Sequence, residues 1–362
     1  MQWPPAAFRV HQIAETLTFL NPASRNDQCE GKPAKVAPIQ LDEVGENWCT
    51  SVPEPLEPYR TGRTAVPNIN EPASMTKATG PLNKLIEDAL RCLAAQHEET
   101  APLELQDWRP VTELCRRTSA ATLKAAIALS KSPEKLRRVL GAIVLGRLGN
   151  RPQKPGGVFR EERYLALKEL FETEMGAEAD PDVMADICSA FCKLDDRRAA
   201  PVMLPLFDHP SAQIRFLVAL AISGHDDEAT IQALIRLSAD PEEEIREVAT
   251  LSFTQVDADS AAIRAALHKR LDDRFGETKD AAIRALARRK DRSVLPFLFR
   301  ELVGKHPFTL LEAAKQMADP SLCPALQQVW KKILGRIAHN QYEALSWQSA
   351  CQAAMDACDC RM

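Results

Sequence analysis

The stretch HPSAQIRFLVALAISGHDDEATIQALIRLSADPEEEIREVATLSF, residues 209–253, contains the same pattern twice. IRFLVALAI at 214–222 returns thirty-one residues later as IREVATLSF at 245–253. In both segments apolar or small residues recur every three or four positions, which is typical of a buried stripe on a helix. A turn with Asp and Pro precedes each segment, at 208–210 and 240–241, and both residue types are common where helices begin. The stretch therefore predicts two successive helical units.

The pattern extends in both directions along the chain. Related segments are VMADICSAF at 183–191, TKDAAIRAL at 278–286, TLLEAAKQM at 309–317 and, more distantly, RRVLGAIVL at 137–145. A helix pair of this size cannot bury its own apolar face, so it must stack on its neighbours. The sequence predicts an all-α fold, an α-solenoid or superhelix of helix pairs, over residues 81–357, with the clearest repeats over 180–335.

The first 80 residues have a different composition. They contain 10 of the 25 prolines and almost no helical periodicity. Proline at this density removes backbone donors and disfavours helix in the residue before it, which predicts a largely disordered or extended leader. Met75 stands just before the first periodic helix and is an alternative start of the protein. At the other end, residues 358–362 are expected to be a short tail.

Composition limits the class of protein. The 362 residues carry a net charge of −4, and only 6% of them are aromatic. No apolar run is long enough for a membrane helix and the N-terminus has no signal-peptide core, which favours a cytoplasmic protein. The ten cysteines are scattered, so no disulfide framework is expected. Cys351, Cys358 and Cys360 cluster near the end but match no standard zinc spacing, and we expect no metal and no cofactor.

The quoted segments resemble HEAT repeats. More narrowly, they resemble the phycobilisome-lyase-type HEAT-like repeats found in many uncharacterised bacterial proteins, over roughly residues 120–335. The resemblance implies that the second helix of each pair lines a concave wall. It also implies a ladder between neighbouring repeats, formed by a turn Asp and an Arg of the second helix. The residues that match the ladder are Asp208, Arg215, Asp240 and Arg246, with Lys279 replacing Arg in the next unit, where the ladder should weaken.

The concave wall is the first candidate binding surface. Positions between the packed stripes of successive second helices should face inward, and they are Phe216, Leu220, Glu247, Thr250, Leu251, Asp280 and Ile283. The apolar members form a strip across three units, and exposed contiguous apolar surface usually marks a binding site for a peptide or helix. Alternatively, some of these side chains pack against the adjacent helix, because a change of one residue in the predicted register of the helix turns them from the inner face into the core.

Charge provides the second candidate surface. Residues 115–160 contain eleven basic residues and one acid, residues 172–260 are acidic, and residues 261–306 are basic again. Such zoning favours a phosphate-bearing or acidic partner, although solvated helix faces are an alternative interpretation. The basic candidates are Arg116, Arg117, Lys124, Arg137, Arg138 and Arg147.

Motifs for chemistry are missing. The chain has no dinucleotide-binding glycine motif, P-loop, zinc-protease motif or nucleophile elbow. These observations favour a non-enzymatic scaffold or adaptor whose concave face binds a protein or peptide partner. Two alternatives stay open. One is a nucleic-acid-binding HEAT-like protein that acts through the basic 115–160 region, with a DNA-glycosylase-like protein as one form of it. The other is a lyase-type accessory subunit for cofactor attachment.

Overall fold

The computed structural model describes residues 81–95, 108–150, 157–176, 180–304, 307–336 and 341–360. The chain divides into two units, Met1–Ile69 and Asn70–Met362, and all the described residues belong to the second. The predicted proline-rich leader, including Met75, lies outside the described residues.

Helices, joined by short turns, make up this part of the chain, and no strand occurs among the residues described. The α-helices are α2 (Leu82–Ala95), α3 (Arg109–Arg116), α4 (Ala120–Ser130), α5 (Lys135–Arg147), α6 (Arg160–Gly176), α7 (Pro181–Leu194), α8 (Ala199–Met203), α9 (Ala212–Ile222), α10 (Glu228–Leu237), α11 (Glu243–Ser252), α12 (Ala261–Arg270), α13 (Gly276–Arg288), α14 (Leu295–Val303), α15 (Leu311–Met317), α16 (Cys323–Arg336) and α17 (Gln341–Ala357). Within the described ranges, none of these helices has the length and apolar character needed to cross a membrane.

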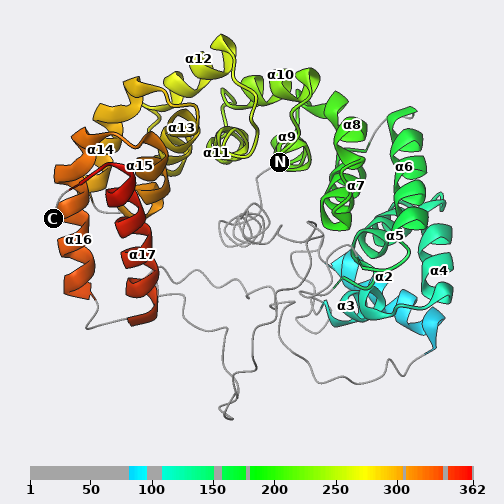
Figure 1. The fold of residues 1–362 in the computed structure, drawn as a ribbon. Helices are drawn as coiled ribbons and strands as arrows, with labels where there is room; N and C mark the ends of the chain where they lie inside the picture. Colours follow the sequence, from blue (N-terminus) through cyan, green and yellow to red (C-terminus); the bar gives the residue numbers. More distant parts are fainter. Residues whose placement is uncertain are drawn as a thin grey trace, which may run out of the picture. The chain divides into compact units, whose positions relative to one another are not determined.

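The helices form two layers within this unit (Figure 1). The inner layer, which contains the helices predicted to line the concave wall, consists of α5, α7, α9, α11, α13, α15 and α17, each in contact with the next. The outer layer consists of α4, α6, α8, α10, α12, α14 and α16. The predicted all-α solenoid of stacked helix pairs is confirmed.

Small residues allow the inner helices to approach closely. Ala249, Ala282 and Ala285 have no exposed surface. Between α5 and α7 the approach is tighter still, because a Cβ atom added to Gly146 would lie 2.6 Å from the Cα atom of Ala190. Each helix therefore shares its core with the next, which also accounts for the low aromatic content.

One buried arginine binds the C-terminal end of α5. Arg163 is fully buried, and its guanidinium donates to the carbonyls of Leu145, Gly146 and Val158. The last carbonyls of a helix have no partner within the helix, so Arg163 satisfies the C-terminal end of α5. The spacing of the repeats did not predict this role.

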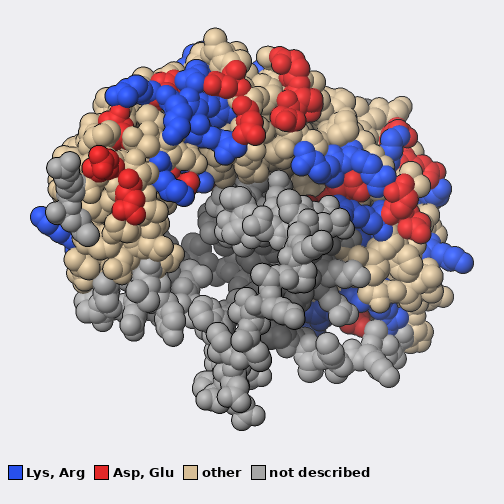
Figure 2. Space-filling view, viewed as in Figure 1, with Lys and Arg blue, Asp and Glu red and all other residues tan. Residues whose placement is uncertain are grey.

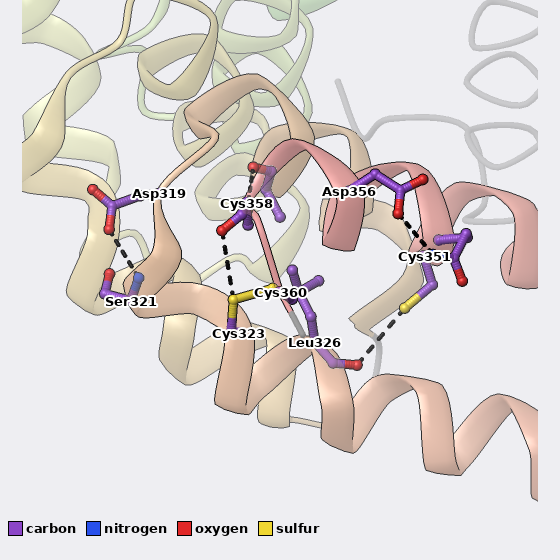
Figure 3. The surroundings of a disulfide bond; sticks show 10 residues. Asp319, Ser321, Cys323, Leu326, Cys351, Asp356, Cys358 and Cys360 are labelled. Atoms are coloured by element: carbon purple, nitrogen blue, oxygen red, sulfur yellow. Dashed lines mark hydrogen bonds between the residues drawn. A yellow bond between two sulfur atoms is a disulfide. The ribbon is translucent and has the colours of Figure 1, made fainter. Parts of the chain in front are cut away.

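A disulfide ties the last described residue to the start of α16. Cys323 and Cys360 are joined, with their Cα atoms 5.3 Å apart (Figure 3). The scattered cysteines were expected to form no disulfide framework, and this single bond was not predicted: α17 returns along α16 and brings together cysteines 37 residues apart in sequence. Cys351 and Cys358 are buried beside it, and their thiols donate to carbonyls of α16 and α15. Disulfides are typical of oxidising compartments, so the cytoplasmic location stays a prediction.

Removing this disulfide should destabilise the oxidised protein. Because the bond closes a loop of 37 residues, we expect Cys360→Ser to lower the free energy of unfolding by about 4 kcal/mol, mainly through the entropy of the unfolded chain. Urea denaturation with and without dithiothreitol measures this. The free thiol variant Cys192→Ser serves as the control and should keep the parent's response to reductant. Equal stability of the parent and Cys360→Ser without reductant would contradict the prediction.

Candidate functional site

Two arginines of the inner layer bind the turn of the next repeat. Nε and Nη2 of Arg215 on α9 lie 2.7 and 2.9 Å from the carboxylate oxygens of Asp240. The same two atoms of Arg246 on α11 lie 2.9 and 3.1 Å from the carboxylate of Asp273. Both pairs are bidentate, which is the strongest geometry for an Arg–carboxylate contact. We call these two pairs the ladder rungs.

Each rung also holds the turn that precedes its own helix. Nη1 of Arg246 donates to the carbonyls of Asp240 and Pro241, both at 3.0 Å. Nη1 of Arg215 bonds the two equivalent carbonyls of its own turn. The carboxylate of Asp240 therefore accepts hydrogen bonds from Arg215, and the backbone carbonyl of Asp240 accepts one from Arg246. The rungs connect three successive turns into one hydrogen-bonded line.

Both predicted ion pairs, Asp208 with Arg215 and Asp240 with Arg246, are wrong, because each arginine pairs with the carboxylate of the following turn and Arg246 bonds only the carbonyl of Asp240. Asp208 is exposed and does not bind Arg215, which pairs with the Asp of the following turn instead. The ladder position of the turn before α9 is His209, which matches Asp240 and Asp273, and the preceding inner helix α7 carries Met184 at the arginine position. Arg138 on α5 bonds the carbonyls of its own turn, Ser132 and Pro133, as the rung arginines do, but its contact with a carboxylate is a single one, from Nε to Glu174 at 2.6 Å.

Beyond Asp273 the described inner helices add no further bidentate arginine to the ladder. Lys279 occupies the arginine position on α13, and its Nζ lies 3.8 Å from Glu301. A lysine presents a single point charge and cannot form the two parallel bonds of a guanidinium.

The apolar members of the predicted concave strip are mostly in the core. Phe216, Leu251 and Ile283 are buried, and only Leu220 is partly exposed. The expectation of an exposed apolar strip is therefore wrong. The helices that carry these residues, α9, α11 and α13, contact one another directly, and their small neighbours let them pack closely.

Two polar members of the same set, Glu247 and Thr250, are also buried, and the pKa of Glu247 is shifted. Glu247 is 7% exposed. Burial raises its pKa to about 7, and the carboxylates of Glu277, Glu244 and Glu243 add to the rise. Thr250, one turn further along α11, has no exposed surface. The charged groups that act on Glu247 are thus carboxylates.

The charges continue across the next two inner helices. Burial raises the pKa of Asp280 on α13, opposed by a hydrogen bond of 3.0 Å from the Thr309 hydroxyl. Burial lowers the pKa of Arg284, and the nearby carboxylates of Asp280 and Glu312 oppose this. We call Glu247, Asp280, Arg284 and Glu312 the inner charged row. It offers carboxylate acceptors, but no three acidic, His or Cys side chains in the described ranges are arranged to hold a metal ion.

The predicted basic patch is divided by acidic partners. Arg137 pairs with Glu87 and Glu134, Arg138 with Glu174, and Arg117 with Glu113. The charge counted along residues 115–160 is therefore reduced by acids from other elements. Arg116 and Lys124 are exposed, and Arg147 is half-buried.

A blue surface also gathers over α12 and α13 (Figure 2). Its charge is compensated too, since Arg264 pairs with Asp259 and Asp291, and Arg288 pairs with Asp257.

Comparisons with known proteins agree with this geometry. Residues 169–254 match the family model of HEAT repeats. Protein YibA of Escherichia coli K12 is 28% identical over 211 residues, which are 58% of this chain and 74% of YibA, and YibA of Escherichia coli O157:H7 gives the same values. The X-ray structure of Escherichia coli YibA has a TM-score of 0.55 at 22% identity, covering 80% of this chain and 99% of that chain.

Residues 169–254 carry HEAT repeats. The repeats account for the equal spacing of the inner helices and for the rungs between their turns. A fold of this kind serves many functions, so the function has to be argued from the site.

Breaking a rung of the HEAT array should cost more than breaking an exposed pair. Arg246 and Asp273 have side chains 9% and 4% exposed, and removing one partner of a buried pair typically costs about 3–5 kcal/mol. Arg292 forms a similar contact with Asp319 but is 76% exposed, and such pairs are worth about 0–1 kcal/mol. Denaturation of Arg246→Ala and Arg292→Ala should show this difference; equal losses would contradict the assigned role of the rung.

The raised pKa of Glu247 should appear as a pH-dependent stability. Between its unfolded pKa of 4.5 and its folded pKa of about 7, the folded state holds a proton that the unfolded state releases, so stability falls as pH rises. Glu247→Gln removes this loss and should stabilise the protein by on the order of 3 kcal/mol at pH 8, with little effect at pH 4. Urea denaturation of the parent and the variant at both pH values measures this difference in the free energy of unfolding. An equal gain in stability at pH 4 and pH 8 would contradict the burial of this charge.

Proposed function

We propose that this chain is a non-enzymatic protein-binding scaffold whose inner layer of HEAT repeats holds a protein partner. The observation that carries the proposal is the inner charged row. Glu247 is a buried charge on α11, Asp280 and Arg284 are half-buried charges on the neighbouring α13, and burying charges opposes folding. Features that lower stability without a structural benefit concentrate at functional sites.

The rungs support the same proposal. They tie successive turns through buried bidentate pairs, so the row is displayed on helices with a fixed spacing. A preorganised surface binds with a smaller entropic loss than a flexible one. A partner that lies across α9, α11 and α13 contacts several repeats at once, as extended segments do in grooves between helices.

The alternatives receive no comparable support. Acidic partners neutralise much of the basic 115–160 region, so nucleic-acid binding is not proposed as a second function. The role as an accessory subunit for cofactor attachment stays a prediction.

Photo-crosslinking tests the proposal. Benzoylphenylalanine replaces Leu220, a partly exposed residue of the inner layer, in the full chain expressed in its own host. The matched control places the same group at Leu165, which is 54% exposed on α6 of the outer layer. We expect a discrete crosslinked protein from position 220 and none from position 165. No crosslink at 220, or the same products from both positions, would contradict the proposal.

A further inference from the structure

Helix α17 is the terminal helix of the described inner layer. Its main contacts among the described helices are with α15 and α16, whereas α15 lies between α13 and α17. In a repeat array the terminal helix covers the last apolar face, and its detachment breaks only its own contacts, so it can open as a local unit. The attachment of α17 can therefore change while the preceding repeats stay folded.

The disulfide fixes the C-terminal end of this helix. The chain joins the end of α16 to the start of α17, and the Cys323–Cys360 bond joins the end of α17 to the start of α16 (Figure 3). Both ends of α17 are thus attached to α16 in the oxidised protein. A helix near a chain terminus frays from its unattached end unless something ties that end down. The bond therefore removes the route by which α17 would detach.

The turn after α17 directs Cys360 back toward α16. Asp359 has a left-handed backbone with a φ of 53°, which Asp tolerates better than most residues do. The amide of Asp359 donates to the carbonyl of Asp356, and the amide of Cys360 donates to that of Met355. These two bonds form the Schellman pattern that ends a helix. The backbone thus places Cys360 beside Cys323 through a defined turn.

This bond is open to solvent, whereas two thiols beneath α17 are not. Cys323 and Cys360 are partly exposed. Cys351 and Cys358 are 0% and 1% exposed. Burial raises the pKa of both thiols, that of Cys351 to about 11, and a protonated, shielded thiol does not take part in disulfide exchange. A dissolved dithiol can therefore reach the disulfide while the thiols next to it stay unreactive.

We propose that the Cys323–Cys360 bond is a redox switch that holds α17 when oxidised and releases it when reduced. One thiolate of a dithiol attacks a sulfur of the bond, the S–S bond breaks, and the second thiol of the reductant displaces the mixed disulfide. Two electrons and two protons pass to the cysteines, and the reductant leaves as a disulfide. The proposal goes beyond the scaffold function and does not depend on it.

Release of α17 uncovers the sides of α15 and α16 on which it packs. The Cys358 thiol donates to the carbonyl of Ala314 on α15, and the Cys351 thiol donates to that of Leu326 on α16. Ala314 and Leu326 have no exposed surface while α17 is in place. The two thiols therefore lie at the contact that opens, and their reactivity reports whether α17 is attached.

Alkylation of these thiols in the full chain tests the switch. The parent is kept oxidised, or is reduced with dithiothreitol and desalted, and is then pulsed with N-ethylmaleimide. Peptide mapping by mass spectrometry reads each cysteine separately. Cys351 and Cys358 should react at least about tenfold faster in the reduced protein, because the end of α17 is no longer tied. Cys115 on α3 and Cys188 on α7 are buried far along the chain from α17 and should react slowly in both states.

A variant separates the effect of the bond from that of the reductant. Without any reductant, the double variant Cys323→Ser/Cys360→Ser should label Cys351 and Cys358 as fast as the reduced parent does. The control Cys192→Ser removes a free thiol of α7 and should behave as the parent in both states.

Three results would overturn the proposal. Unchanged protection of Cys351 and Cys358 after reduction would show that α17 stays attached and that the bond is only structural. Equally fast labelling of Cys115 and Cys188 in the reduced parent would show that the whole array opens rather than its last helix. Slow labelling of Cys351 and Cys358 in the double variant would show that the bond does not control their exposure.

Discussion

The ladder rungs are the contacts on which the rest of this structure depends. A single helix pair has no closed core, so its stability comes from faces shared with its neighbours. Arg215–Asp240 and Arg246–Asp273 join turns that belong to different repeats, and Asp240 takes part in both as carboxylate and as carbonyl. These buried bidentate contacts specify how far one repeat is shifted and rotated against the next. The inner charged row keeps its spacing for the same reason.

Two consecutive residues of α11, Arg246 and Glu247, are both buried charges but differ in whether an opposite charge neutralises them. Arg246 is neutralised by Asp273, donates four hydrogen bonds in all, and stabilises the stack. Glu247, the next residue, is equally buried but faces three further carboxylates. A sequence selected for stability alone would place an uncharged residue there.

The fold was predictable because its signal is local. The apolar spacing of Ile245, Val248 and Ala249 needs only the helix period, and its return after thirty-one residues reveals the stack. The pairing of side chains was less predictable. Arg215 lies seven residues after Asp208 and twenty-five before Asp240, and only the turn between repeats decides between them. The burial of Phe216, the role of Arg163 and the Cys323–Cys360 bond also depend on chain segments that meet in three dimensions.

Native-state hydrogen exchange of an Asp273→Asn variant tests the shared core most directly. The substituted amide keeps the size of the side chain but removes the charge that holds Arg246. If neighbouring repeats share one core, amide protection should fall together in α9, α11 and α13, in which the rungs and their contacts lie. Loss of protection confined to the turn around residue 273, with α9 and α11 unchanged, would contradict the account.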